Sequence, residues 1–360
     1  MGEIKGLSFL NANNLEGMLP PEISLLGHSL QFLIFNRQLE LTGSIPTEIG
    51  HLTKLTDLTL SATGLSGTLP TELGLLGVLD YLVIAHNQMV FGTIPTELGN
   101  LSNLACFQLV KSYLTGSFPK EFFKLTQLEV LNVDDCPGLN TSAVLPGVVE
   151  SMHQLKQLVL SSRTFGEVMP VPSQIGLLRN ISNLGLTNWK INGTLPPELW
   201  SLTALNFLSL DGNSITGTLQ QSMFSLTFLS NLDLGTNQME GTLPPDLFSK
   251  LTKLRYFQIN NNPFSGSIPT EAGLLSSLKK LEMHNTNLSG TIPAEVLALD
   301  NLTSLVVANT SLSGSIPEQL CGKMYQQELK CFGGQCYQVK SDNPIFQGTS
   351  LCGCDCVPCQ

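Results

Sequence analysis

The chain has 360 residues, of which 42% are hydrophobic and only 13% charged, so a substantial apolar core is expected. The formal net charge is −10, and the 18 lysine and arginine residues are spread along the chain, which excludes the basic footprint of a nucleic-acid-binding protein. No stretch approaches 18 consecutive apolar residues, so we expect no direct insertion of this chain into a membrane.

A short phrase of the form Gly-x-Ile/Leu-Pro recurs along almost the whole chain. GSIP begins at Gly43, GTLP at Gly67, GTIP at Gly92 and GSIP again at Gly314. Most neighbouring copies lie 24 or 25 residues apart. Between copies the sequence follows L-x-x-L-x-x-L-x-L-x-x-N-x-L-x-G, with one clear copy over 202–217. A fixed period of this length indicates a stack of identical structural units.

The pattern within one repeat predicts its local structure. The L-x-L pair has the two-residue period of a strand that points both leucines inward. Three residues later, an Asn side chain can bond the backbone where the strand turns away. One repeat cannot bury its leucines alone, so neighbours must stack. We therefore predict an α/β-type solenoid of about 13 repeats over residues 1–320, with a parallel β-sheet on the concave face and short helical or 3-10 turns on the convex face.

Residues 139–172 depart from the repeat. Two interpretations remain open: one or two degenerate repeats with a loosened register, or a functional island that projects into a ligand site. Two cysteines lie within repeats. Cys106 is predicted to point outward from its strand as an accessible thiol, and Cys136 is predicted to be buried in the Asn position of its repeat.

The phrase LTGSIPTEIGHLTKL at 41–55, and the consensus around it, resemble the plant-type 24-residue leucine-rich-repeat family. The resemblance covers about residues 7–320 and implies a twisted, superhelical solenoid that recognises peptides, proteins or glycans. Members form the ectodomains of receptor-like kinases and receptor-like proteins, and the secreted polygalacturonase inhibitors. The family's N-terminal cap and a signal peptide are missing from this sequence, so we expect a truncated N-terminus. No kinase motif is present.

The last forty residues, 321–360, are dense in cysteine and resemble the tails of leucine-rich-repeat proteins of diatoms and other algae. We interpret them as a disulfide-bonded C-terminal cap. The alternative is a thiolate metal cluster, because two of the cysteines have a zinc-like C-x-x-C spacing. The cap cysteines are Cys321, Cys331, Cys336, Cys352, Cys354, Cys356 and Cys359.

Seven Asn-x-Ser/Thr sequons fall at variable positions of the repeat or in the irregular stretch, and none falls on an inward leucine position. They favour an extracellular or cell-surface location. The predicted glycosylation sites are Asn100, Asn140, Asn180, Asn192, Asn287, Asn301 and Asn309.

No HExxH, GxSxG or phosphate-binding loop occurs, so the sequence favours a binder over an enzyme, with no cofactor and no metal. The expected function is a recognition module for a peptide, protein or glycan ligand, as the ectodomain or ectodomain fragment of a receptor-like protein. A secreted inhibitor or adhesion protein, and an intracellular scaffold with reduced cysteines, remain as alternatives.

The most regular repeats carry aromatic and polar residues at outward positions flanking the L-x-L pair. Aromatic side chains beside polar anchors are typical of binding hot spots. The excess of acidic groups there favours a neutral or basic partner, such as a peptide with Lys or Arg. The predicted binding residues are Phe207, Asp211, Asn231, Asp233, Tyr256 and Gln258.

Overall fold

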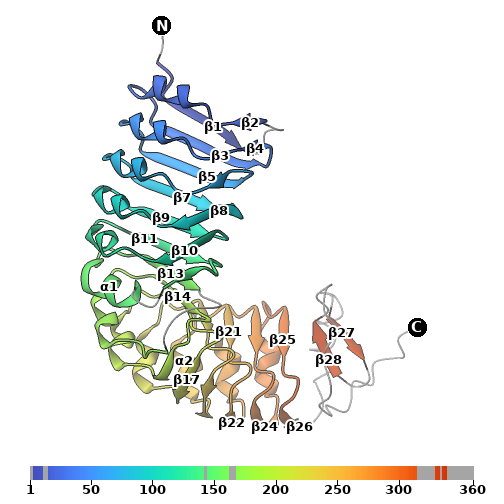
Figure 1. The fold of residues 1–360 in the computed structure, drawn as a ribbon. Coiled ribbons are helices and arrows are strands. Elements are labelled where there is room, and N and C mark those ends of the chain that lie inside the picture. Colours follow the sequence, from blue (N-terminus) through green and yellow to red (C-terminus); the bar gives the residue numbers. More distant parts are fainter. Residues whose placement is uncertain are drawn as a thin grey trace. The chain divides into compact units, whose positions relative to one another are not determined.

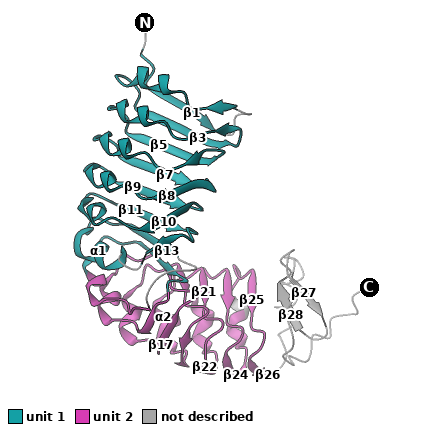
Figure 2. Cartoon of the chain, in the orientation of Figure 1, with its two compact units in different colours: residues 1–167, 177–189 teal, residues 168–176, 190–360 magenta. Residues whose placement is uncertain are grey.

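The computed structural model describes residues 3–10, 15–141, 144–161, 168–313, 329–332 and 335–338. The chain divides into two compact units (Figure 2). Unit 1 comprises residues 1–167 and 177–189, and unit 2 comprises residues 168–176 and 190–360.

Each repeat contributes one strand to a long sheet, and the thirteen strands run in sequence order (Figure 1). All the described pairings within this sheet are parallel, as the L-x-L pattern predicts. The strands of unit 1 are β1 (Gly6–Leu10), β3 (Phe32–Gln38), β5 (Asp57–Thr63), β7 (Tyr81–Ala85), β9 (Cys106–Val110), β11 (Val130–Asp134), β13 (Gln157–Ser161) and β14 (Asn183–Thr187). The strands of unit 2 are β16 (Phe207–Ser209), β18 (Asn231–Asp233), β21 (Tyr256–Gln258), β23 (Lys280–Glu282) and β25 (Ser304–Val306).

Short 3-10 helices follow the proline position of the repeated phrase, which Gln220 occupies in one repeat, and they confirm the predicted helical turns. Proline suits this place because its fixed φ and missing N–H end the extended segment. The 3-10 helices are η1 (Pro21–Leu26), η2 (Thr47–His51), η3 (Thr71–Leu75), η4 (Thr96–Asn100), η5 (Lys120–Lys124), η6 (Ser173–Leu177), η7 (Pro197–Ser201), η8 (Gln221–Ser225), η9 (Thr270–Leu274) and η10 (Ala294–Ala298). In two repeats an α-helix takes this place, α1 (Val144–Ser151) and α2 (Pro245–Lys250). The first of these lies in the stretch that departs from the repeat pattern.

A second set of short strands lies between the long-sheet strands and the helices, where the chain runs into the glycine of the repeated phrase. Gly241, for example, has a φ of 90°, a conformation that glycine adopts without steric cost. These strands are β2 (Gly17–Met18), β4 (Leu41–Thr42), β6 (Ser66–Gly67), β8 (Met89–Thr93), β10 (Tyr113–Ser117), β12 (Leu139–Asn140), β15 (Asn192–Thr194), β17 (Ser214–Gly217), β19 (Gln238–Met239), β20 (Gly241–Thr242), β22 (Phe264–Gly266), β24 (Asn287–Thr291) and β26 (Ser311–Ser313). Farther along the chain, β27 (Leu329–Phe332) pairs with β28 (Gln335–Gln338) in an antiparallel ladder.

The core of each unit lies between its long-sheet strands and its helices. The inward leucines of the strands, such as Leu58 in unit 1 and Leu232 in unit 2, are fully buried. Phenylalanine rings fill the wider spaces, and Phe248 of α2 packs edge-on against Phe257 of β21. Each fully buried leucine contributes roughly 1.5–3 kcal/mol. The stacked core therefore supplies most of the stability that one repeat alone lacks.

The Asn position of the repeat bonds adjacent repeats to each other. In unit 2 the buried Asn237 amide accepts a hydrogen bond from the Ile215 N–H at 3.0 Å and donates to the Leu210 carbonyl at 2.9 Å, both in the preceding repeat. It also donates to carbonyls of its own repeat, at Leu234 and Gly235. The three carbonyls each accept one further hydrogen bond, from Asn213, Asn262 and the Gly212 N–H, whereas the Asn237 amide is the acceptor of the Ile215 N–H.

The cysteine in the same position behaves as predicted. Cys136 is buried, and its sulfur lies 3.3 Å from the Ser112 hydroxyl and 3.6 Å from the Leu109 carbonyl. A thiol makes fewer and weaker hydrogen bonds than an amide, so this repeat is joined to its neighbour less firmly than the repeat of Asn237.

We predict that Asn237→Ala lowers the free energy of unfolding by about 2–4 kcal/mol, because the buried Ile215 N–H loses its acceptor and three carbonyls each lose one of two donors. Chemical denaturation followed by circular dichroism measures the change. The exposed Asn206→Ala is the control, and we expect it to cost less than about 1 kcal/mol. Equal losses in the two variants would contradict the role of the Asn position.

Candidate ligand-binding face

The outward side chains of the unit 2 strands form three columns, which we call the unit 2 face. The strand register places the first two columns side by side, and backbone hydrogen bonds such as Thr236 N–H to Asn260 O extend the order to the third. The first column is Phe207, Asn231, Tyr256, Lys280 and Ser304; the second is Ser209, Asp233, Gln258, Glu282 and Val306; the third is Asp211, Gly235, Asn260, His284 and Ala308.

The six residues that the sequence singled out all lie on this face, in adjacent repeats. Asn231 stands between Phe207 and Tyr256 in the first column. The Gln258 amide nitrogen donates to the Asp233 carboxylate at 3.3 Å. All six side chains are half-buried, the two aromatic ones included. Neighbours in a column stand about 4.8 Å apart, so each side chain covers part of the next.

Burial dominates the electrostatics of the second column. It raises the pKa of the Asp233 carboxyl from 3.8 to about 6. The Gly235 N–H, which donates to Asp233 at 3.0 Å, opposes the rise, while the carboxylates of Asp211 and Glu282 add to it. Lys280 lowers this pKa, and its ammonium pairs with Glu282 at 2.8 Å. The face therefore holds three carboxyl groups and one lysine.

The third column shows the same effect of burial. It raises the pKa of Asp211, although hydrogen bonds with Thr236 and the Gly212 backbone act in the opposite direction. It lowers the pKa of His284, because a charged imidazolium loses hydration there. Acids and a histidine shifted in these directions are held closer to their neutral forms than they are in water.

Two side chains of the third column were missed by the sequence reasoning. The Oδ1 atom of Asn260 and the Nδ1 atom of His284 are buried without a hydrogen-bond partner among the described residues. The signal that would have found them is their repeat position. They stand one and two repeats beyond Gly235, in the column that begins with the predicted residue Asp211.

Unit 1 carries outward columns of the same kind, and they correct one expectation. The register places Cys106 on the outward face between Tyr81 and Val130, as predicted. Its side chain, however, is only 5% exposed, so the predicted accessible thiol is wrong. Burial raises the pKa of the Cys106 thiol, which keeps it protonated and unreactive. Facing direction follows from the period of two, but exposure depends on the size of the side chains in the neighbouring columns.

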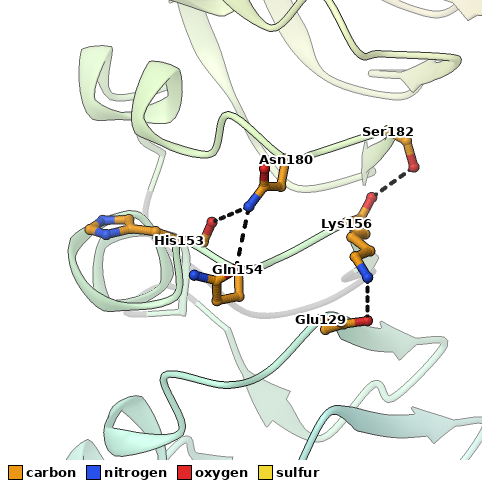
Figure 3. A network of polar contacts seen from close by, with 6 residues as sticks. All are labelled: Glu129, His153, Gln154, Lys156, Asn180 and Ser182. Atoms are coloured by element: carbon orange, nitrogen blue, oxygen red, sulfur yellow. Dashed lines mark hydrogen bonds and ion pairs between the residues drawn. The ribbon is translucent and has the colours of Figure 1, made fainter.

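A surface network in unit 1 includes one predicted glycosylation site (Figure 3). The Asn180 amide donates to the His153 carbonyl at 3.3 Å and to the Gln154 side chain at 3.4 Å. Nearby, the Lys156 ammonium pairs with Glu129 at 2.7 Å. Both partners of this ion pair are about half exposed, so it contributes little stability. The network connects successive repeats at their surface and contains no recognisable chemistry of its own.

The other predicted sites are distributed as follows. Six of the seven sequon asparagines have exposed side chains, and Asn140 is half-buried. Cys331 and Cys336 lie on the backbone ladder of β27 and β28, and their side chains are not described. The remaining cap cysteines lie outside the described residues: Cys321, Cys352, Cys354, Cys356 and Cys359.

Two general findings apply to the described part of the chain. It contains no group of three or more His, Cys, Asp or Glu side chains placed to hold a metal ion. None of its helices is long and apolar enough to cross a membrane.

Comparison with protein-family models finds no match for the chain, and comparison with curated proteins finds none either. Solved structures do match. One is a TDR receptor, 31% identical with a TM-score of 0.74, over 86% of this chain and 52% of that one. Another is the plant peptide hormone receptor RGFR1 in complex with RGF2, 26% identical with a TM-score of 0.67, over 89% of this chain and 57% of that one.

A third is the leucine-rich-repeat ectodomain of the membrane receptor kinase GASSHO1/SCHENGEN3 from Arabidopsis thaliana, in complex with CASPARIAN STRIP INTEGRITY FACTOR 2. It is 28% identical with a TM-score of 0.66, over 88% of this chain and 42% of that one. The chain thus spans about half the length of the receptor structures it matches. The fold is that of an α/β leucine-rich-repeat solenoid, and the solved structures similar to it include ligand-binding receptor ectodomains.

The buried carboxyl of Asp233 leads to a prediction on stability. Its pKa is 3.8 in the unfolded chain and about 6 in the folded one, so its favourable contribution is complete below pH 3.8 and is lost as the pH rises through 6. At pH 7 we expect Asp233→Asn to be more stable than the wild type by about 1–3 kcal/mol. The difference should shrink toward pH 4.

Urea denaturation across this pH range measures both effects. The variant Asp246→Asn removes an exposed carboxylate of α2 and controls for the loss of charge alone. If the stability curves of Asp233→Asn and the wild type run parallel from pH 4 to pH 7, the carboxyl does not titrate as described.

Proposed function

We propose that the chain is a non-catalytic recognition module that binds a peptide or protein ligand on the unit 2 face. The observation that carries this proposal is the first column, where Phe207 and Tyr256 flank Asn231 in strict register. Half-buried aromatic rings offer a large contact area at little cost in conformational entropy. Polar anchors stand beside them in the second column, at Asp233 and Gln258.

The composition of this face favours a ligand that carries hydrogen-bond donors and positive charge. Three carboxyl groups face outward in the second and third columns, against one lysine. A partner of complementary potential is steered to such a surface and held by the aromatic contacts. RGFR1 and GASSHO1/SCHENGEN3, whose solved structures are similar, are each in complex with a partner. That similarity supports a peptide or protein partner for this chain.

We further propose that the chain acts outside the cell, as the whole or part of the ectodomain of a receptor-like protein. Two features support this setting. Six of the seven sequon asparagines are exposed, which glycosylation requires. The cysteine-dense segment over 321–360 suits an oxidising compartment, where its thiols would form the cap predicted for the end of the repeats.

The binding proposal predicts the effect of removing each aromatic ring. A short linear peptide selected on the wild-type chain from a displayed random library serves as the probe. Phe207→Ala and Tyr256→Ala should each weaken its binding by at least about 1 kcal/mol while the melting temperature stays nearly constant. Titration calorimetry measures the affinity.

Unit 1 offers a matched control. Tyr81 occupies the same repeat position in β7 and is exposed, so Tyr81→Ala removes a comparable ring from the other unit. Its effect on affinity should be negligible. If the selected peptides bind both unit 2 variants with unchanged affinity but bind Tyr81→Ala more weakly, the binding face lies on unit 1.

The extracellular setting is tested on the protein secreted from eukaryotic cells. We expect peptide N-glycosidase to reduce its mass, and we expect thiol alkylation without reductant to leave most cap cysteines unlabelled. Full labelling of all seven without reductant would overturn the disulfide cap. Stoichiometric zinc, measured on the same sample, would support the thiolate cluster instead.

A further inference from the structure

Polar side chains of the two neighbouring repeats lie close over Gly235 on the unit 2 face. A Cβ atom built on Gly235 would lie 2.8 Å from Asp211 Oδ1, 3.0 Å from Asn260 Oδ1 and 3.1 Å from Asn260 Nδ2, so only glycine lets both side chains approach this closely. The two oxygens therefore converge over Gly235 from the repeats on either side of it. The Asp233 carboxylate adjoins the same spot, since it accepts the Gly235 N–H at 3.0 Å.

Asn260 provides evidence that this group of oxygens can accept a hydrogen bond from a ligand. Its side chain is 9% exposed, and its Oδ1 atom is buried with no hydrogen-bond partner among the described residues. A buried acceptor without a partner is uncommon and calls for a specific reason. Here the oxygen lies over Gly235 with Asp211 Oδ1 on the other side, and a donor from outside the chain would complete its hydrogen bonding.

The charged side chains around Gly235 favour a cation as that hydrogen-bond donor. Asp211, Asp233 and Glu282 are the carboxyl groups of the face, and Lys280 is the single cation on it. Lys280 is engaged with Glu282 at 2.8 Å. Neither Asp211 nor Asp233 forms an ion pair with a described residue, although Lys280 attracts Asp233 from a distance, and both lie near the unpartnered Asn260 oxygen. A compact group with several N–H donors fits such a set of acceptors.

We propose that Asp211, Asp233 and Asn260 form a cradle over Gly235 that binds a primary ammonium group of the ligand. This inference rests on the proposed function and specifies what the unit 2 face recognises. The ammonium can come from a lysine side chain or from the amino terminus of the ligand, since both present the same three donors. The aromatic column beside the cradle supplies apolar contact for the rest of the ligand.

The cradle has a direct consequence for pH dependence. The groups that face Asp233 are Asp211, Gln258, Lys280 and Glu282, with His284 farther along the third column. Because the pKa of Asp233 is about 6, acidification to pH 5 neutralises most of its negative charge and so weakens its attraction for a cation. Protonation of His284 acts in the same direction. The affinity for an ammonium group should fall about tenfold between pH 7.5 and pH 5.

The test uses the full chain and Nα-acetyl-lysine N-methylamide as probe, with binding followed by saturation-transfer NMR. We expect saturable binding at pH 7.5 that is lost when the ε-amine is also acetylated. Asp211→Asn and Asn260→Leu should each weaken the binding at least tenfold. Leucine matches asparagine in size and removes the acceptor, so Asn260→Leu should fold at least as stably as the wild type.

The matched control is Asp57→Asn in unit 1. Asp57 is an outward carboxyl of β5 in the other unit. Its pKa is also raised by burial and its oxygen accepts the Thr59 hydroxyl at 2.9 Å, much as Asp211 is hydrogen-bonded with Thr236. Its replacement should leave probe binding unchanged. Alanine N-methylamide, which offers only an α-ammonium group, is the second probe. Stronger binding of this probe supports the cradle and assigns it to an amino terminus, and stronger binding of the lysine probe assigns it to a side chain.

Three results would overturn the cradle. They are equal binding of the doubly acetylated probe, no binding of either ammonium probe at millimolar concentration, and unchanged binding in Asp211→Asn and Asn260→Leu. The proposed function fails separately. If the affinity of the library peptides depends on Phe207 and Tyr256 but not on Asp211 or Asn260, the proposed binding face holds and the ammonium site is wrong.

Discussion

The packing of each repeat against the next is the constraint on which this structure depends, and in several repeats a buried Asn amide adds hydrogen bonds to the backbone where the strand ends. A solenoid has a core only where one repeat packs against the next, so the backbone groups buried between two repeats need hydrogen-bond partners. Asn262 shows the arrangement a second time: it accepts the Met239 N–H at 2.9 Å and donates to the Leu234 carbonyl at 2.8 Å. The inward leucines of the strands complete the packing between repeats, which fixes the register of the long sheet.

A constant register has a consequence for binding. Because each repeat adds one residue to each outward column, side chains separated by about 25 residues in sequence become neighbours on one surface. The scaffold does not restrict what stands in those columns. In both units they hold aromatic rings, carboxyl groups and a buried amide oxygen without a described partner, which belongs to Asn260 in unit 2 and to Asn132 in unit 1.

The unit 2 face, where we propose that the ligand binds, holds two features that lower stability. Asp233 keeps a carboxyl group in a half-buried place that raises its pKa to about 6, and Asn260 keeps a buried acceptor without a donor. Both features lower the stability of the free protein, and a ligand with a suitable donor would relieve both. The leucine core and the hydrogen bonds of the buried Asn amides compensate for the stability that these two features lose.

The sequence by itself determined the repeat, the strand within it, the parallel sheet and the direction in which each strand residue faces. A period of two within the strand and a period of about 25 along the chain are local properties, and no tertiary contact was needed to derive them. This is why the leucines of the L-x-L pair were correctly placed inside and Phe207 outside. The tertiary structure alone decided how deeply an outward residue is covered and which polar atoms meet. Cys106 faces outward and is buried, and Asn260 converges with Asp211 over Gly235. Burial and pairing depend on the volumes and rotamers of side chains from three repeats at once, and a pattern within one repeat does not contain them.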